Sequence, residues 1–169
     1  MIAIAPFAEK HLPGVVDVIL PIQQAEFNIP ISLEAQPDLR DIPGFYQKEN
    51  GNFWVALQGE AVVGTIALLD IGRGQGALRK MFVKKPFRGA VWGVASELLD
   101  VLLDWCQSRG VQVVYLGTTS KFLAAHRFYE KNGFEIINQS ALPESFPIMS
   151  VDTKFYRYTV DQRAGNHSI

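Results

Sequence analysis

The chain has 169 residues, of which 48% are hydrophobic and 20% are charged, and its formal net charge is −1. This length fits one domain, large enough to bury about two thirds of its unfolded surface. The small net charge argues against a broad nucleic-acid-binding surface. No run approaches the roughly 20 apolar residues that span a bilayer, and the N-terminus lacks the features of a signal peptide. We therefore expect a cytoplasmic protein with no membrane partner.

The single cysteine, Cys106, excludes an intramolecular disulfide. It falls within a helical apolar pattern, which predicts a packed core residue rather than a nucleophile. No cluster of Cys and His suggests a metal site, so no metal cofactor is expected.

The periodicity predicts an alternation of strands and helices over residues 1–160, with a disordered tail at 161–169. Pro21 is expected to kink or end the first helix, and Asp38 or Asp41 to cap the second. Gly110 is placed to stop the long helix. In chain order we expect a strand near residues 2–6, a helix over 9–26, a short helix reaching Tyr46, strands at 53–57, 61–69 and 78–83, a helix over 92–109, a strand at 111–116, a helix over 121–131, and strands at 134–137 and 154–160.

This order, β α α β β β α β α β β, predicts one domain of the α/β (α+β) class. A run of antiparallel strands comes first, and strands joined through helices follow. Such a pattern implies a single mixed sheet with helices on both faces.

Residues 78–99 predict an anion site. The strand is followed by a loop with Lys84, Lys85 and Arg88, and then by a helix N-terminus. The first N–H groups of a helix have no intrahelical partner, and the helix dipole adds about half a positive charge there. Gly89 and Gly93 let the backbone approach a phosphate without a Cβ in the way. The stretch therefore predicts a pyrophosphate-binding loop.

Two motifs resemble the GNAT superfamily of acetyl-CoA-dependent N-acetyltransferases: MFVKKPFRG at residues 81–89 and AHRFYEKNGF at residues 125–134. The resemblance covers roughly residues 1–160. It implies a mostly antiparallel sheet that is splayed between its fourth and fifth strands, with acetyl-CoA as co-substrate. The chain departs from the family loop pattern, because Arg88 lies two residues too early if Gly93 and Ala95 are the last motif positions.

The resemblance also implies roles for individual residues. The backbone of residues 81–83 would pair with the pantetheine arm of the cofactor and place the thioester carbonyl near a backbone N–H. Tyr129 would protonate the leaving thiolate as a general acid; alternatively, its ring only packs beside Phe128. Where the family often has Asn, this chain has Phe122, so Thr119 or Ser120 replaces that contact or the contact is lost. The implied cofactor contacts are Met81, Phe82, Val83, Arg88, Gly89, Gly93, Val94, Ala95, Ser96, Thr119, Phe128 and Lys131.

No general base is evident from the sequence. Glu26, Asp70 and His126 are candidates, with His126 expected to face solvent; deprotonation through water is the alternative. The resemblance places the acceptor site among the first two helices and the loop at 139–150. Glu26, Asp38 and Asp41 hint at a cationic amine, and the acceptor class is a small-molecule or peptide amine.

One alternative remains beside an active enzyme: a GNAT-like domain could bind acyl-CoA as a sensor or partner-binding module without turnover. Whether or not the protein is an enzyme, a strand at 154–160 on the sheet edge could pair with a second copy in a homodimer. A nucleotide-binding Rossmann fold is disfavoured, because no Gly-rich turn follows the first strand.

Overall fold

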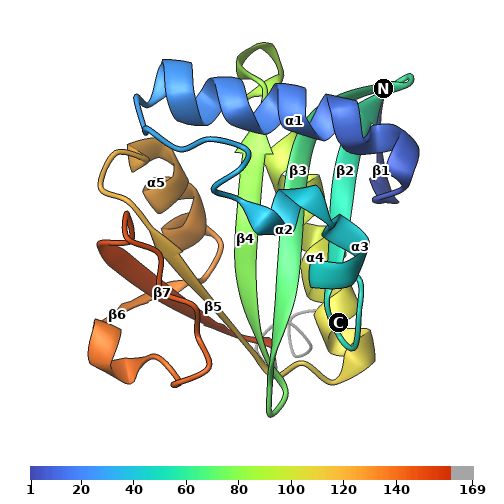
Figure 1. Cartoon of the computed structure of the whole chain (residues 1–169). Helices are drawn as coiled ribbons and strands as arrows, with labels where there is room; N and C mark the ends of the chain where they lie inside the picture. Colours follow the sequence, from blue (N-terminus) through green and yellow to red (C-terminus); the bar gives the residue numbers. More distant parts are fainter. Residues whose placement is uncertain (161–169) are drawn as a thin grey trace.

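The computed structural model describes residues 1–160, and the tail at 161–169, predicted to be disordered, lies outside the described residues. The strands form one seven-stranded sheet in the order β1-β2-β3-β4-β5-β7-β6 (Figure 1). The strands are β1 (Ile2–Pro6), β2 (Asn52–Gln58), β3 (Ala61–Gly72), β4 (Gln75–Val83), β5 (Val113–Thr118), β6 (Glu135–Ile137) and β7 (Lys154–Thr159). The α-helices are α1 (Leu12–Pro21), α2 (Pro37–Arg40), α3 (Ile42–Phe45), α4 (Val94–Arg109) and α5 (Leu123–Lys131), and single turns lie at η1 (Glu9–His11), η2 (Ile22–Glu26), η3 (Lys85–Phe87) and η4 (Gln139–Ala141).

The sheet is splayed between its fourth and fifth strands. Neighbouring strands pair antiparallel except for β4 and β5, which are parallel and pair only from Gln75↔Val113 to Ala77↔Tyr115. Beyond this point β4 and β5 diverge, as the two ribbons in Figure 1 show. The predicted mixed, mostly antiparallel sheet and its splay are therefore confirmed.

The interpretation of residues 154–160 as an edge strand is wrong. β7 pairs with β5 over its whole length, from Val113↔Thr159 to Thr118↔Lys154, and with β6 on its other side. Because β5 leaves β4 after Tyr115, β7 supplies the backbone partners that β5 then needs. The sheet edges are formed by β1 and β6, so β7 offers no free edge to a second copy.

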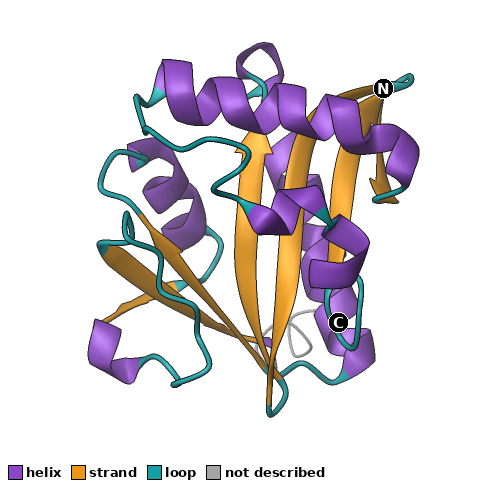
Figure 2. Cartoon of the chain, in the orientation of Figure 1, coloured by secondary structure: helices purple, strands orange, loops and turns teal. Residues whose placement is uncertain are grey.

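Helices cover both faces of the sheet, as predicted (Figures 1 and 2). One apolar cluster joins the sheet to α1, α2 and α3, with Val15, Ile19 and Tyr46 fully buried. The other joins the sheet to α4 and α5 and contains Leu98 and Leu102. Cys106 lies in this second cluster with no exposed surface, which confirms the prediction of a core cysteine.

The N-terminal helical region differs from its predicted form. The α-helix ends at Pro21, as predicted, but the chain continues directly into the wide turn η2, where the Phe27 N–H bonds the Ile22 carbonyl at 3.1 Å. The predicted second helix is two short helices that meet at Asp41. The Asp41 carboxylate accepts the Gly44 N–H at 3.1 Å, which is the predicted capping role.

Candidate functional site

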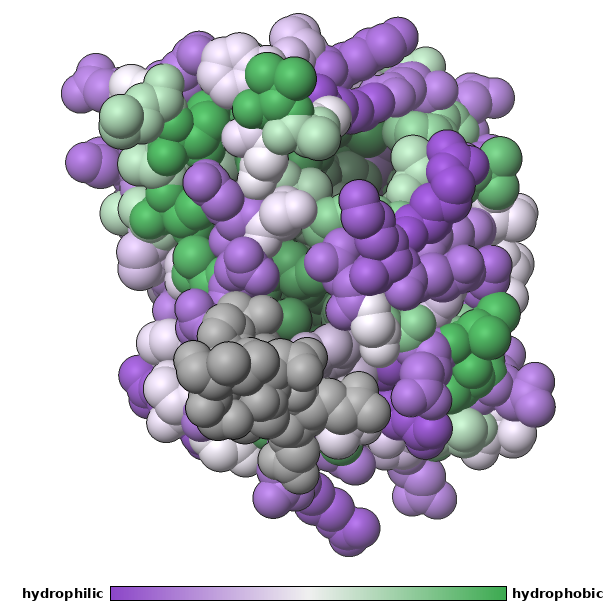
Figure 3. All heavy atoms as spheres, turned by 180° about the vertical axis from the view of Figure 1, so that it is seen from behind, coloured by the Kyte–Doolittle hydropathy of each residue, from purple (hydrophilic) through white to green (hydrophobic). Residues whose placement is uncertain are grey.

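The splay opens a cavity of about 540 Å³ between β4 and β5, bounded by α5, the start of α4 and η2. Seen from behind, a recess in the upper half of the molecule has apolar residues in its depth, and its rim contains both apolar and hydrophilic residues (Figure 3). The predicted site residues that line the cavity are Glu26, Met81, Phe82, Val83, Arg88, Gly89, Ala95, Thr119, Phe128 and Tyr129. Gly93, Val94, Ser96 and Lys131 do not line it; the Val94 side chain is buried in the core, and Lys131 is exposed at the end of α5.

A bulge reshapes β4 at the cavity wall. The register with β3 shifts between Thr65↔Phe82 and Ala67↔Arg79, so Lys80 and Met81 together oppose one residue of β3. Lys80 has a φ of 52°, the left-handed backbone conformation that residues other than glycine rarely adopt. The Thr65 hydroxyl donates to the Lys80 carbonyl at 2.7 Å. Because β5 has already diverged, the second half of β4 has no strand partner on its β5 side, where it lines the cavity; its last carbonyl, that of Val83, accepts the Arg88 Nε–H.

The loop after β4 leads to an uncapped helix N-terminus. Gly93 is the N-cap of α4 in the left-handed conformation, with a φ of 65°, and no side chain caps the helix. The first intrahelical bond runs from the Glu97 N–H to the Gly93 carbonyl, so the N–H groups of residues 94–96 have no intrahelical partner. The helix begins at Val94, two residues after the predicted start at Trp92, because the chain turns at Gly93 first.

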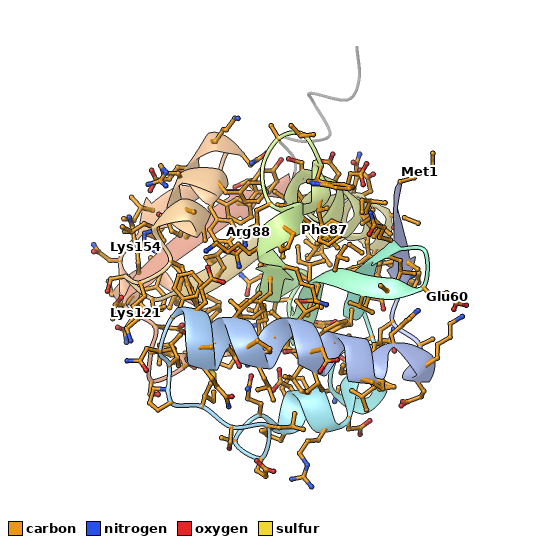
Figure 4. The ribbon with its side chains drawn as sticks, turned by 90° about the horizontal axis from the view of Figure 1, so that it is seen from above. Met1, Glu60, Phe87, Arg88, Lys121 and Lys154 are labelled. Carbon is orange, nitrogen blue, oxygen red and sulfur yellow. The ribbon has the colours of Figure 1, made fainter. Side chains whose placement is uncertain are left out.

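Arg88 is fixed in place by two partners beside the cavity. Its guanidinium donates to both Glu26 carboxylate oxygens, at 2.5 and 2.7 Å, and its Nε donates to the Val83 carbonyl at 2.8 Å. Figure 4 shows Arg88 beside the upper end of β4. The hydrogen bonds from Arg88 lower the pKa of Glu26, so this carboxylate is a weaker base than an unpaired glutamate.

Tyr129 lies in the cavity wall with its ring held by aromatic neighbours. Ring centroids of Phe134 and Tyr156 lie 5.5 and 5.9 Å away. No residue within 1–160 hydrogen-bonds its hydroxyl, and no fully buried side-chain oxygen in that range lacks a partner, so the hydroxyl opens onto the cavity. Burial raises the pKa of this phenol well above its usual value, so it stays protonated at neutral pH.

The start of α5 closes the cavity from the other side. Phe122 packs edge-on against Phe27, with ring centroids 4.6 Å apart, and fills the position where the family often has Asn. The Thr119 carbonyl lies 2.9 Å from the His126 Nε2, and the Thr119 hydroxyl accepts the Lys121 N–H at 3.4 Å. His126 is therefore buried as an anchor of this turn, and the expectation that it faces solvent is wrong.

The acidic residues proposed as bases or cation-binding groups have other partners. Asp70 accepts the N–H groups of Asn50 and Gly72 in a turn, and it does not line the cavity. Asp38 is buried, accepts the Tyr46 hydroxyl at 2.5 Å and pairs with two cations of β4. Because Asp41 caps α3 and Glu26 pairs with Arg88, the hint of a cationic acceptor loses its basis.

Four charged cavity residues were missed in the sequence: Arg79, Lys80, Lys121 and Asp152. Arg79 and Lys80 are two adjacent cations within an otherwise apolar strand, and this is a signal that the sequence does contain. Asp152 follows an irregular loop. Burial raises the pKa of its carboxyl, and this effect outweighs the hydrogen bond from Met149 and the charge of Arg79, which both lower it. No pattern in the loop sequence indicates that this residue returns to the cavity.

Within residues 1–160 no three His, Cys, Asp or Glu side chains gather closely enough to hold a metal ion. No helix in the same range has both the length and the apolar character needed to cross a bilayer.

Residues 17–134 match the acetyltransferase (GNAT) family. An N-acetylaspartate synthetase from Danio rerio is 34% identical over 105 residues, which are 61% of this chain and 36% of that protein. The chain thus spans about a third of the length of this curated relative.

Solved structures agree with the family match. A GNAT-family acetyltransferase from Staphylococcus aureus Mu50 superposes with a TM-score of 0.90 at 37% identity, covering 95% of this chain and 99% of that one. An N-acetyltransferase from Thermoplasma acidophilum, solved with coenzyme A, has a TM-score of 0.71 over 94% of this chain and 99% of that one; at 15% identity it shares the fold alone. By sequence match and by the splayed sheet, the chain belongs to the GNAT family of acetyltransferases.

Proposed function

We propose that the protein transfers an acetyl group from acetyl-CoA to a primary amine of a small molecule or peptide, by direct attack of the amine on the thioester. One observation carries this proposal. The pairing of β4 with β5 stops at Ala77↔Tyr115, and the open edge of β4 and the Tyr129 hydroxyl then face the same cavity. A cofactor arm on that edge would bring its thioester to the phenol.

The loop and the start of α4 would hold the cofactor's phosphates. The unpaired N–H groups of Val94, Ala95 and Ser96 point out of a helix whose dipole favours an anion. Gly89 and Gly93 both have positive φ, and a Cβ built on either meets no atom within 4 Å. This open space beside bare N–H groups fits a pyrophosphate.

Arg88 would add charge at the rim of this loop. Its contacts with Glu26 and Val83 engage three of its five N–H donors, which leaves two for a phosphate oxygen. Lys131, outside the cavity wall, remains a predicted contact of the cofactor's outer phosphates.

The β4 edge would bind the pantetheine arm. Residues 81–83 follow the bulge at Lys80, and their cavity-facing backbone groups would pair with the amides of the arm. A backbone N–H at the bulge would donate to the thioester oxygen, which gains negative charge when the amine attacks. Phe128 and Thr119 would bound the arm on the α5 side.

Tyr129 would complete the reaction as the general acid. As the amine nitrogen bonds to the carbonyl carbon, the carbon–sulfur bond breaks and the thiolate takes the phenolic proton. Glu26 would position Arg88 rather than act as the base, because its pKa is lowered. The amine's proton would leave through water or another carboxylate of the cavity.

Calorimetry with acetyl-CoA, followed by thiol release across a panel of amines, tests this proposal. We expect micromolar binding that weakens with dephospho-CoA, and thiol release that depends on an amine. Binding without thiol release would favour the alternative, a domain that senses acyl-CoA without turnover. An absence of binding at millimolar acetyl-CoA would refute both.

A further inference from the structure

The cavity continues past the bulge into a second hollow that suits the acceptor. This smaller pocket of about 130 Å³ lies between β4, η2 and the loop at 146–152. Arg79, Lys80 and Asp152 line both cavities. A molecule that fills the smaller pocket and reaches into the larger one must pass these three charged groups.

Arg79 is a nearly buried cation with unused donors. Its side chain is 13% exposed, and its guanidinium carbon lies 5.6 Å from the Phe45 ring centroid and 5.9 Å from that of Tyr46. Within residues 1–160 only its Nη2 has partners, the Asp38 carboxylate at 3.8 Å and the Met149 sulfur at 3.7 Å. Since no fully buried side-chain nitrogen in that range lacks a partner, Nε and Nη1 open to the pocket.

Asp38 does not balance the two cations of the strand. Its Oδ2 lies 3.5 Å from Lys80 Nζ and already accepts the Tyr46 hydroxyl. Lys80 also donates to the Gln36 side chain at 2.6 Å, which together with Asp38 holds it against the wall. One carboxylate therefore faces two cations, and Arg79 has the weaker contact with it.

Asp152 supplies a separate negative group on the same cavity. It accepts the Met149 N–H at 2.9 Å and makes no direct ion pair with Arg79, although the charge of Arg79 acts on it and opposes the rise in its pKa. The cavity thus presents a guanidinium and a carboxylate that are not in direct contact. A ligand that carries both an amine and a carboxylate would complement both groups.

We propose that the acceptor is a small amine that bears its own carboxylate, such as a free amino acid, and that the Arg79 guanidinium binds that carboxylate. This inference rests on the proposed acetyl transfer and names its substrate class. Planar guanidinium groups match carboxylates with two parallel hydrogen bonds, which Nη2 makes together with either Nε or Nη1. Nη2 of Arg79 has only long contacts, at 3.7 and 3.8 Å, so it can donate to a ligand carboxylate beside one of the two open nitrogens. Arg79 lies two to three residues before Met81 and Phe82, a span of at most about 10 Å along a strand that the bulge at Lys80 shortens. An amino acid bound to Arg79 would therefore reach the thioester with its amine.

The test compares each free amino acid with its own carboxamide, using thiol release from acetyl-CoA. The two forms share the amine and side chain and differ in the carboxylate. We expect kcat/KM to be about ten- to a hundredfold higher for the best amino acid than for its carboxamide. In Arg79→Gln, KM for the amino acid should rise at least about tenfold, while the carboxamide rate and the Kd of acetyl-CoA stay within about twofold.

Two further variants make the result specific. Arg79→Lys keeps the charge but loses the fork, so its KM for the amino acid should lie between those of wild type and Arg79→Gln. Arg157→Gln removes an arginine whose ion pair with Glu135, at 3.9 Å, is exposed, and should change no constant. Equal rates for amino acids and carboxamides, or an Arg79→Gln variant that slows both equally, would overturn the substrate class and leave acetyl transfer standing. If the wild-type protein did not bind acetyl-CoA, the proposed function itself would be refuted.

Discussion

Replacement of Gly93 by Ala tests the phosphate-binding loop, and Gly110 provides a matched control. Gly93 and Gly110 flank α4 at its two ends, with φ of 65° and 74°, and a Cβ built on either meets no atom within 4 Å. Alanine in this conformation costs about 1–2 kcal/mol at either position. The two variants should therefore unfold at similar temperatures, about 2–8 °C below wild type for a domain of this size.

The two variants should differ in acetyl-CoA affinity. The Cβ at Gly93 would occupy open space beside the bare N–H groups of residues 94–96, where the pyrophosphate is proposed to lie. An anion at a helix N-terminus gains up to about 2 kcal/mol, so Gly93→Ala should raise the Kd up to about thirtyfold. Gly110→Ala, at the far end of the helix, should leave the Kd unchanged. Equal Kd values for the two variants by calorimetry would refute this placement of the phosphates.

Three further variants probe the site and its pH dependence. Tyr129→Phe should lower kcat about ten- to a thousandfold with acetyl-CoA affinity nearly intact, and wild-type turnover would contradict the acid role. Glu26→Gln should lower the melting temperature at pH 7, and this difference should vanish as the pH falls through the lowered Glu26 pKa, because protonated Glu26 no longer pairs with Arg88. Asp152→Asn should show the opposite pH dependence. Because burial raises the Asp152 pKa, the wild type loses stability as the pH rises through that pKa, whereas the variant, which has no carboxyl there, does not. Melting curves across pH 2–7 check both signs, and pH-independent differences would refute them.

The strands of the sheet were predictable because they depend on local pattern, since alternating and apolar runs marked them. The splay was expected only through the resemblance of the motifs at 81–89 and 125–134 to the GNAT family. The position of β7 was not predictable in this way. Residues 154–160 alternate as an edge strand would, and only the divergence of β5 from β4 shows why β7 is needed inside the sheet.

The charges of the site were harder to predict, because their partners are distant in sequence. Asp38 has the residue type of a helix cap, and its pairing with Lys80 joins positions 42 residues apart. The pairing of Glu26 with Arg88 spans 62 residues. A single sequence does not indicate such pairs, so carboxylates that hold other protein groups were interpreted as binding groups for an amine.

The bulge at Lys80 explains how one strand can serve both substrates. Before it, β4 pairs with β5 and is closed to ligands; after it, the strand offers open backbone groups to a cofactor arm. The bulge itself sends two consecutive cations, Arg79 and Lys80, to the Asp38 side of the cavity. The amine of a molecule held there would meet the thioester on the same strand, so the separation of the two substrates is set by rigid backbone rather than by a loop.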